Sequence, residues 1–299
     1  MKTPETNHEQ TLAAILDIYA RIQQLNKDGL SNLIQQIDCY MQENAQDLVQ
    51  ELQAKLYIAS GEVCMRLGNL SRAEEDFVQG LKHCKGLADI SYKIKATNGL
   101  CTLRAMHSDY IPAIEGWTKI LEEITDIKTK GDILNNLGIA YSMTARYQQA
   151  LDCQFQSLKI DEELQREAEI GTDYFNLATS YMKLRHLDRA LELYEEAIAI
   201  FEKLDNQRYL GFAFSNLSML YTDMQDLDKA MDNAQRSLSI KMSFGNEQDI
   251  GNTLANLGNI LNQLGRFDSA LEHYNKAREY FELCNDKSAL SGINYRFAN

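Results

Sequence analysis

The chain has 299 residues, a formal net charge of −13 and only two prolines, Pro4 and Pro112. An acidic chain is a poor partner for nucleic acid and for anionic membrane surfaces, because both repel negative charge. The scarcity of proline and the abundance of Leu, Ala, Glu, Gln and Lys, which favour helices, predict an all-α protein.

The six cysteines are scattered, without a C-x-x-C pair or a recurring spacing. This distribution indicates reduced, small apolar residues and favours a cytoplasmic protein. The sequence has no signal-peptide pattern and no run of about 20 apolar residues, the length that a membrane span needs. His83 and Cys84 are adjacent, and adjacent helical residues point in different directions, so we expect no metal site there. We expect no cofactor.

The first helix pairs are predicted from weak copies of a repeated pattern. Residues 1–45 hold a divergent pair that we interpret as an N-terminal cap, and residues 46–127 hold two degenerate pairs. Asn69 and Asp109 each precede an apolar residue, as Asp226 does later, and short polar side chains at such sites cap the following helix.

Residues 128–285 contain four copies of the full pattern at a spacing of 40 residues. The copies are Gly131-x4-Asn136-Leu137-Gly138, Gly171-x4-Asn176-Leu177-Ala178, Gly211-x4-Asn216-Leu217-Ser218 and Gly251-x4-Asn256-Leu257-Gly258. A fixed period in this range predicts a stack of similar helix pairs. The small residue after each Leu allows a neighbouring helix to approach, and we expect that helix to touch at Ala150, Ala190, Ala230 and Ala270. The first Gly of each copy indicates either a close packing contact or a turn between repeats.

We therefore predict seven helix pairs, at roughly 11–44, 46–86, 88–127, 128–165, 167–205, 207–245 and 247–285. Residues 286–299 begin a further first helix in register, which we interpret as truncated. The apolar face of residues 267–283 would then be covered by another helix, by an output domain or by self-association with a second copy.

The motif Asn-Leu-Gly-x-x-Tyr, followed after a loop by Tyr-x-x-Ala-Leu, resembles the tetratricopeptide repeat. The resemblance implies an α-solenoid, a right-handed superhelix of about seven helix pairs. The usual repeat has 34 residues and often ends in proline, whereas these units have 40 and no proline there. We expect the extra residues to lengthen the helix ends, in a variant similar to the repeats of kinesin light chains and bacterial signalling proteins.

The resemblance also implies protein or peptide binding in a concave groove lined by the first helix of each pair. Helical spacing places one stripe there for each of the four units. The stripes are Asp132, Asn135, Asn136, Ile139, Ser142 and Met143; Thr172, Phe175, Asn176, Thr179, Met182 and Lys183; Phe212, Ser215, Asn216, Met219, Thr222 and Asp223; and Asn252, Ala255, Asn256, Asn259, Asn262 and Gln263. The candidate peptide-binding residues are Asn136, Asn176, Asn216, Asn256, Asn259, Phe175, Met182, Phe212 and Met219. Asn side chains both donate and accept hydrogen bonds, so they suit an extended peptide backbone, while the apolar residues would receive its side chains. The alternative is that these Asn residues bond within the scaffold. Because the groove has almost no Lys or Arg, a carboxylate clamp for heat-shock chaperones is disfavoured.

No catalytic constellation competes with this interpretation. The five histidines are dispersed, the glycines follow the repeat and form no phosphate-binding loop, and the Glu pairs are typical of solvated helix faces. We interpret the chain as a binding scaffold and not an enzyme, serving as the sensory input region of a bacterial signalling protein with a diguanylate cyclase or histidine kinase output. The alternatives are a quorum-sensing peptide receptor and a structural adaptor in a multiprotein complex.

Overall fold

The computed structural model describes residues 12–17, 19–20, 22–44, 48–243 and 247–298, and these residues form helices and short connections without any strand. The all-α prediction is confirmed. The chain divides into two compact units, residues 1–144 and 145–299. Residues 1–11, 18, 21 and 45 of the predicted N-terminal cap lie outside the described part. Within the described ranges, no helix is long and apolar enough to cross a membrane.

The first unit is built around apolar side chains from α2 to α5, among them Ile37, Leu56 and Phe77. Its elements are η1 (Ile22–Gln24), α2 (Lys27–Glu43), α3 (Gln50–Arg66), α4 (Leu70–His83), α5 (Ser91–Met106), α6 (Tyr110–Leu121) and α7 (Ile127–Met143). The predicted cap at Asn69 is confirmed, since its side chain accepts a hydrogen bond from the Arg72 N–H at 3.4 Å. Asp109 occupies the same position before α6, but its side chain makes no capping bond, so that prediction was wrong.

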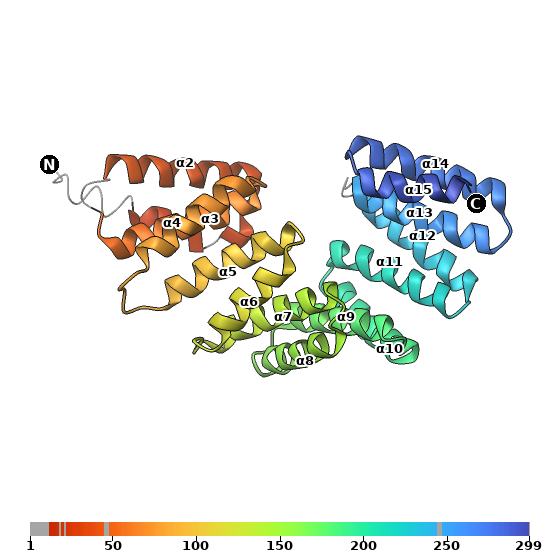
Figure 1. The fold of residues 1–299 in the computed structure, drawn as a ribbon, viewed down its shortest axis with the longest axis horizontal. Helices are drawn as coiled ribbons and strands as arrows, with labels where there is room; N and C mark the ends of the chain where they lie inside the picture. Colours follow the sequence, from red (N-terminus) through yellow and green to blue (C-terminus); the bar gives the residue numbers. More distant parts are fainter. Residues whose placement is uncertain (1–11, 18, 21, 45–47, 244–246, 299) are drawn as a thin grey trace. The chain divides into compact units, whose positions relative to one another are not determined.

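The second unit is a series of helices of nearly equal length (Figure 1). They are α8 (Tyr147–Glu163), α9 (Glu167–Lys183), α10 (Leu187–Lys203), α11 (Gln207–Asp223), α12 (Leu227–Met242), α13 (Glu247–Gln263), α14 (Phe267–Leu283) and α15 (Lys287–Ala298). Most are 17 residues long and are joined by three residues, which accounts for the period of 40. The extra residues therefore lengthen the helices, as predicted.

The connections share one backbone conformation. Gln165, Arg185, Asp205, Gln225 and Asn285 all have positive φ angles, as does Gly265. The next N–H bonds back across each turn, for example from His186 to the Tyr181 carbonyl at 3.0 Å. A left-handed residue closing a helix in this way reverses the chain within a few residues, so each helix packs on its predecessor.

Small residues set the distance within each helix pair. The Ser218 hydroxyl donates to the Ala230 carbonyl at 2.8 Å, and a Cβ atom at Gly258 would lie 2.4 Å from Cε1 of Tyr274. The predicted close approach is therefore confirmed. A Cβ atom at Gly251 would lie 2.7 Å from Cε1 of Phe281, so this glycine marks a packing contact inside α13. The interpretation of the periodic glycine as a turn was wrong.

Candidate functional site

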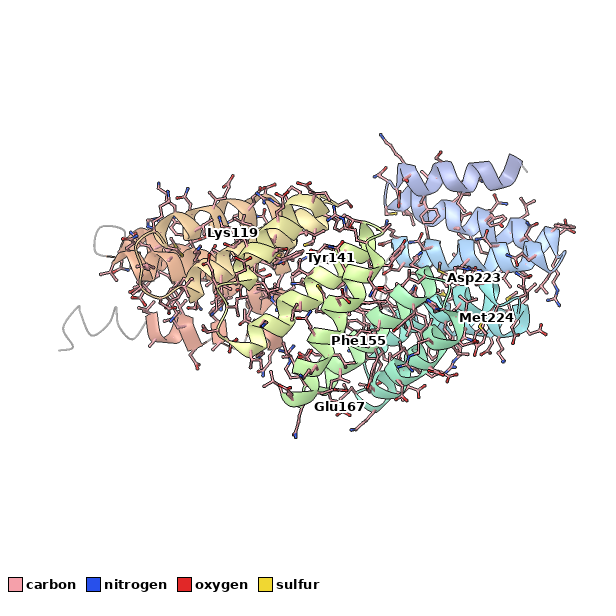
Figure 2. All side chains as sticks on the ribbon, turned by 60° about the horizontal axis from the view of Figure 1, so that its bottom comes forward. Lys119, Tyr141, Phe155, Glu167, Asp223 and Met224 are labelled. Carbon is pink, nitrogen blue, oxygen red and sulfur yellow. The ribbon has the colours of Figure 1, made fainter. Side chains whose placement is uncertain are left out.

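A groove of about 410 Å³ lies between α11, α13 and α15 in the second unit. It is lined by Met219, Asn252, Ala255, Asn256, Asn259, Phe281, Ala289, Gly292 and Ile293. A second hollow of about 290 Å³ shares Met219, Asn256 and Asn259 with it and adds Thr222, Asp223, Asn262 and Gln263. Figure 2 shows Asp223 at the end of α11. Together the two hollows form one continuous surface, which we call the amide groove.

One face of α13 supplies the polar wall of the amide groove. Asn252, Asn256, Asn259 and Gln263 follow a spacing of four, three and four residues, which places them on one side of a helix. Leu257 and Ile260 point the other way and are buried in the core. The same amphipathic pattern that packs α13 therefore aligns its amides along the groove.

The floor of the amide groove is apolar. Phe281 and Ile293 are each 1% exposed, and Met219 on the opposite wall is 42% exposed. A Cβ atom at Gly292 would have no other atom within 4 Å, so the missing side chain leaves open space beside Ile293. This combination places open space and an apolar floor next to side-chain amides.

The Asn residues of the repeat also connect the scaffold. One N–H of Asn216 donates to the Thr179 hydroxyl at 3.3 Å, and one N–H of Asn256 donates to the Ser218 hydroxyl at 2.9 Å. Each bond joins the first helices of consecutive repeats, which supports the alternative that the sequence left open. A side-chain amide has a second N–H and an oxygen with two lone pairs, so Asn256 can hold the scaffold and still bond a ligand.

Asn259 is held in place by α14. Its side-chain oxygen accepts a hydrogen bond from the Tyr274 hydroxyl at 2.9 Å. Because Tyr274 is itself buried, this bond orients the Asn259 amide along the wall of the groove.

The other predicted groove residues lie elsewhere. Asn136 is half-buried in α7 of the first unit, and Asn176 is half-buried in α9. Phe175 packs edge-on against Tyr194, with ring centroids 5.8 Å apart, and the Phe212 ring lies 5.3 Å from the Lys241 ammonium. Met182 is 5% exposed within the core, so it presents no groove surface. Of the nine candidates, Met219, Asn256 and Asn259 line the amide groove.

The groove predicted from the sequence ends at residue 263 and does not include α15. Ala289, Gly292 and Ile293 stand 40 residues after positions 249, 252 and 253. Extending the register of the repeat by one more first helix would have indicated them.

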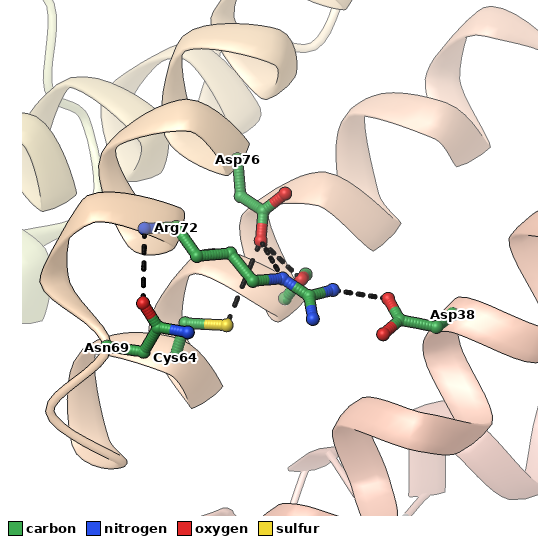
Figure 3. Close-up of polar contacts among 6 residues, drawn as sticks. Asp38, Cys64, Asn69, Arg72 and Asp76 are labelled. Atoms are coloured by element: carbon green, nitrogen blue, oxygen red, sulfur yellow. Dashed lines mark hydrogen bonds and ion pairs between the residues drawn. The ribbon is translucent and has the colours of Figure 1, made fainter.

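The first unit contains a network of charged side chains (Figure 3). Arg72 of α4 forms ion pairs with Asp38 of α2 and, at 3.5 Å, with Asp76. The Ser60 hydroxyl donates to Asp76 at 2.5 Å, and the Cys64 thiol lies 3.9 Å from the same carboxylate. Burial raises the pKa of the Cys64 thiol, which keeps it protonated and a poor nucleophile. The network therefore joins α2, α3 and α4, and its thiol is not poised for covalent chemistry.

Comparison with known proteins agrees with this architecture. Residues 169–243 and 213–283 match the family model of the tetratricopeptide repeat. No protein with a curated description matches the chain in sequence.

Three solved proteins share the fold, and one of them, NprR, is represented by two structures. RapI in its apo form is 14% identical with a TM-score of 0.75, over 93% of this chain and 99% of RapI. The apo quorum sensor NprR from B. thuringiensis is 14% identical with a TM-score of 0.75, over 97% of this chain and 81% of its own. NprR in complex with its cognate peptide NprX is 15% identical with a TM-score of 0.72, over 95% of this chain and 83% of its own. A tetratricopeptide repeat protein from Parabacteroides merdae is 14% identical with a TM-score of 0.65, over 98% of this chain and all (100%) of its own. At these identities the likeness concerns the fold alone.

Proposed function

The chain is a tetratricopeptide repeat protein, and we propose that it binds an extended peptide segment of a partner in the amide groove. The observation that carries this proposal is the pairing of an amide wall on α13 with an apolar floor that opens at Gly292. The proposed role is binding, not catalysis.

The chemistry of the amide groove suits a peptide backbone. An extended peptide presents N–H and C=O groups along its length, and its side chains alternate between opposite faces. The amides of Asn252, Asn256 and Asn259 offer donors and acceptors to that backbone at intervals of about one helical turn. One apolar side chain of the peptide would then enter the space between Met219 and Gly292.

Charge contributes little to this recognition. The ionised residue that lines the groove, Asp223, is paired with Arg185 at 2.6 Å. Neutral amides and an apolar floor select a ligand by backbone bonding and side-chain shape. We therefore expect ligands with a large apolar residue and without a required terminal carboxylate.

Substitution of Gly292 tests the proposal. Gly292→Leu would fill the open space with an apolar side chain, and replacing a helical glycine improves helix propensity, so the fold should be retained. Ser291→Leu adds the same side chain at the neighbouring exposed position and serves as the matched control. Linear peptides selected from a displayed random library against the wild-type chain provide the probe, with binding measured by isothermal titration calorimetry.

We expect selected peptides to share one large apolar residue. Gly292→Leu should weaken their binding by at least about tenfold, which corresponds to about 1.4 kcal/mol, while Ser291→Leu should leave it unchanged. Equal binding by the wild type and Gly292→Leu would place the ligand elsewhere on the protein.

A signalling role is the second candidate. The observation that favours it is the fold shared with the quorum sensor NprR, including NprR bound to its cognate peptide NprX. On this proposal the peptide is a signal, and the chain controls an output such as a diguanylate cyclase or a histidine kinase. The test is whether a groove-binding peptide changes the activity of an output enzyme encoded with this chain, and whether Gly292→Leu abolishes that response.

A further inference from the structure

Consecutive repeats of the second unit pack through the same positions, and we call each such contact a joint. At the α10–α11 joint, the residues are Ala197, Phe201 and Ala213, and all three are buried. The residues 80 positions later at the α14–α15 joint are Ala277, Phe281 and Ile293, which are also buried. Apolar side chains at these three positions are therefore sufficient for the packing of consecutive repeats.

Two joints depart from this chemistry. The α12–α13 joint has buried Ser237, Lys241 and Thr253 at these positions, and the α8–α9 joint has acidic residues there. The residues 40 positions before those of the α10–α11 joint are Ser157, Asp161 and Asp173, and all three are buried. Asp161 is 2% exposed and Asp173 is 1% exposed, so two carboxyl groups are held together away from water. Both side-chain oxygens of Asp173 are buried, and no described hydrogen bond satisfies them. Burial without hydrogen-bond donors favours the protonated form of a carboxyl group over the charged form.

Few charges surround this acid pair. Arg166, in the connection between α8 and α9, places its Nε 3.2 Å from Asp161 and lies 3.8 Å from Glu169 of α9. The other helices packed on α9 are α10 and α11. They present to it an apolar cluster formed by Ala197, Phe201, Leu210, Ala213 and Phe214, and α10 also presents Lys203, whose ammonium pairs with Glu167 of α9. One guanidinium thus faces the two buried carboxyl groups as well as Glu169, and it can balance a single negative charge.

Burial, followed by the neighbouring Asp161 carboxylate, raises the pKa of Asp173 to about 8. Two carboxylates in contact cannot both ionise at low cost, which is the same reason that paired carboxyl groups in other proteins share a proton. At neutral pH, Asp173 is therefore mostly protonated, and Asp161 forms the ion pair with Arg166.

We propose that the Asp161–Asp173 pair makes the α8–α9 joint a proton-dependent clasp, closed while the two carboxyl groups share a proton and loosened when that proton leaves. The proposal does not depend on the amide groove. It assigns regulation to the joint, because a change in the packing of one joint changes the relation of α8 to the repeats that follow it.

The direction of the pH effect follows from the two states of Asp173. In the opened joint Asp173 is hydrated and its pKa is near the ordinary value of 3.8, whereas in the closed joint the pKa is raised. The closed joint holds the proton more tightly, so its stability is complete at low pH and is lost as the pH rises through the raised pKa. For one proton, the equilibrium constant for opening rises by up to about tenfold per pH unit between the two pKa values.

Hydrogen–deuterium exchange of the full chain between pH 6 and pH 9, read by mass spectrometry, tests the clasp. The end of α8 and the start of α9 should become less protected from exchange as the pH rises. Their protection is compared with that of α13–α14, which removes the intrinsic pH dependence of exchange. Asp173→Asn replaces the protonated acid with a neutral amide and should flatten this dependence. Asp188→Asn removes an exposed acid on α10 and should keep the wild-type dependence.

Wild-type protection that does not fall with pH would overturn the proposal. An equal fall in Asp173→Asn, or a flattened dependence in Asp188→Asn, would also overturn it. If Asp173→Asn does not fold, Asp161→Asn decides, because it leaves Asp173 to pair with Arg166 and should also weaken the pH dependence. An unchanged dependence in Asp161→Asn would contradict the clasp.

Discussion

The close packing of α13 on α14 leads to a measurable prediction at Gly258. In Gly258→Ala, the added Cβ would lie 2.4, 2.6 and 3.0 Å from three ring atoms of Tyr274. Tyr274 is 6% exposed, so its ring cannot turn freely away. Overpacking of this kind costs about 1–3 kcal/mol, and a displaced ring would also lose the hydrogen bond from Tyr274 to Asn259, worth about 1 kcal/mol. Replacing a helical glycine by alanine returns about 1 kcal/mol.

The expected net loss is about 1–3 kcal/mol of unfolding free energy, seen as a lower midpoint in urea denaturation followed by far-ultraviolet circular dichroism. Gly292→Ala is the matched control, because its Cβ meets no other atom within 4 Å and only the gain in helix propensity remains. This variant should be more stable than the wild type by up to about 1 kcal/mol. Wild-type stability in Gly258→Ala, or a loss in Gly292→Ala, would refute the packing argument.

Two further substitutions separate scaffold from ligand contacts and test the turns. Asn256→Ala removes the hydrogen bond to Ser218, so it should lower the free energy of unfolding in urea by about 1 kcal/mol and also weaken peptide binding. Asn252→Ala changes an exposed groove position and should weaken peptide binding with little change in stability. A loss of stability in Asn252→Ala comparable to that in Asn256→Ala would contradict this assignment. Gln225 has a φ angle of 64°, so Gln225→Gly should increase the free energy of unfolding by up to about 1 kcal/mol and raise the melting temperature. An unchanged or lower melting temperature would mean that the Gln225 side chain stabilises the turn.

Much of the fold was predictable because each repeat solves the same packing problem with the same residue types. Ala230 follows Leu217 by thirteen residues, and Ser218 next to that Leu meets it across the helix pair. Small residues at a fixed period indicate backbone approach whatever the surrounding side chains are. The amide stripe on α13 was predictable for the same reason, since helical spacing alone places its members on one face.

The turns were not apparent from composition. Left-handed residues are usually glycine, and the glycine signal is present at Gly265 but missing at Gln165, Arg185 and Gln225. The favourable packing of two long helices on either side outweighs the local strain at each turn. The even spacing of these residues becomes visible only when the helix ends are known.

The sequence by itself determined the helices, their period, their buried faces and the amide stripe, because these follow from spacing along one chain. Only the tertiary structure decided that Asn216 and Asn256 bond hydroxyl groups of the preceding repeat and that Met182 is buried. It also placed Asp161 beside Asp173, although acidic residues on helices are usually solvated. These outcomes depend on which side chains meet across two helices, and a carboxyl group on a helix has the same local preferences whether its partner is water, an arginine or a second carboxyl group.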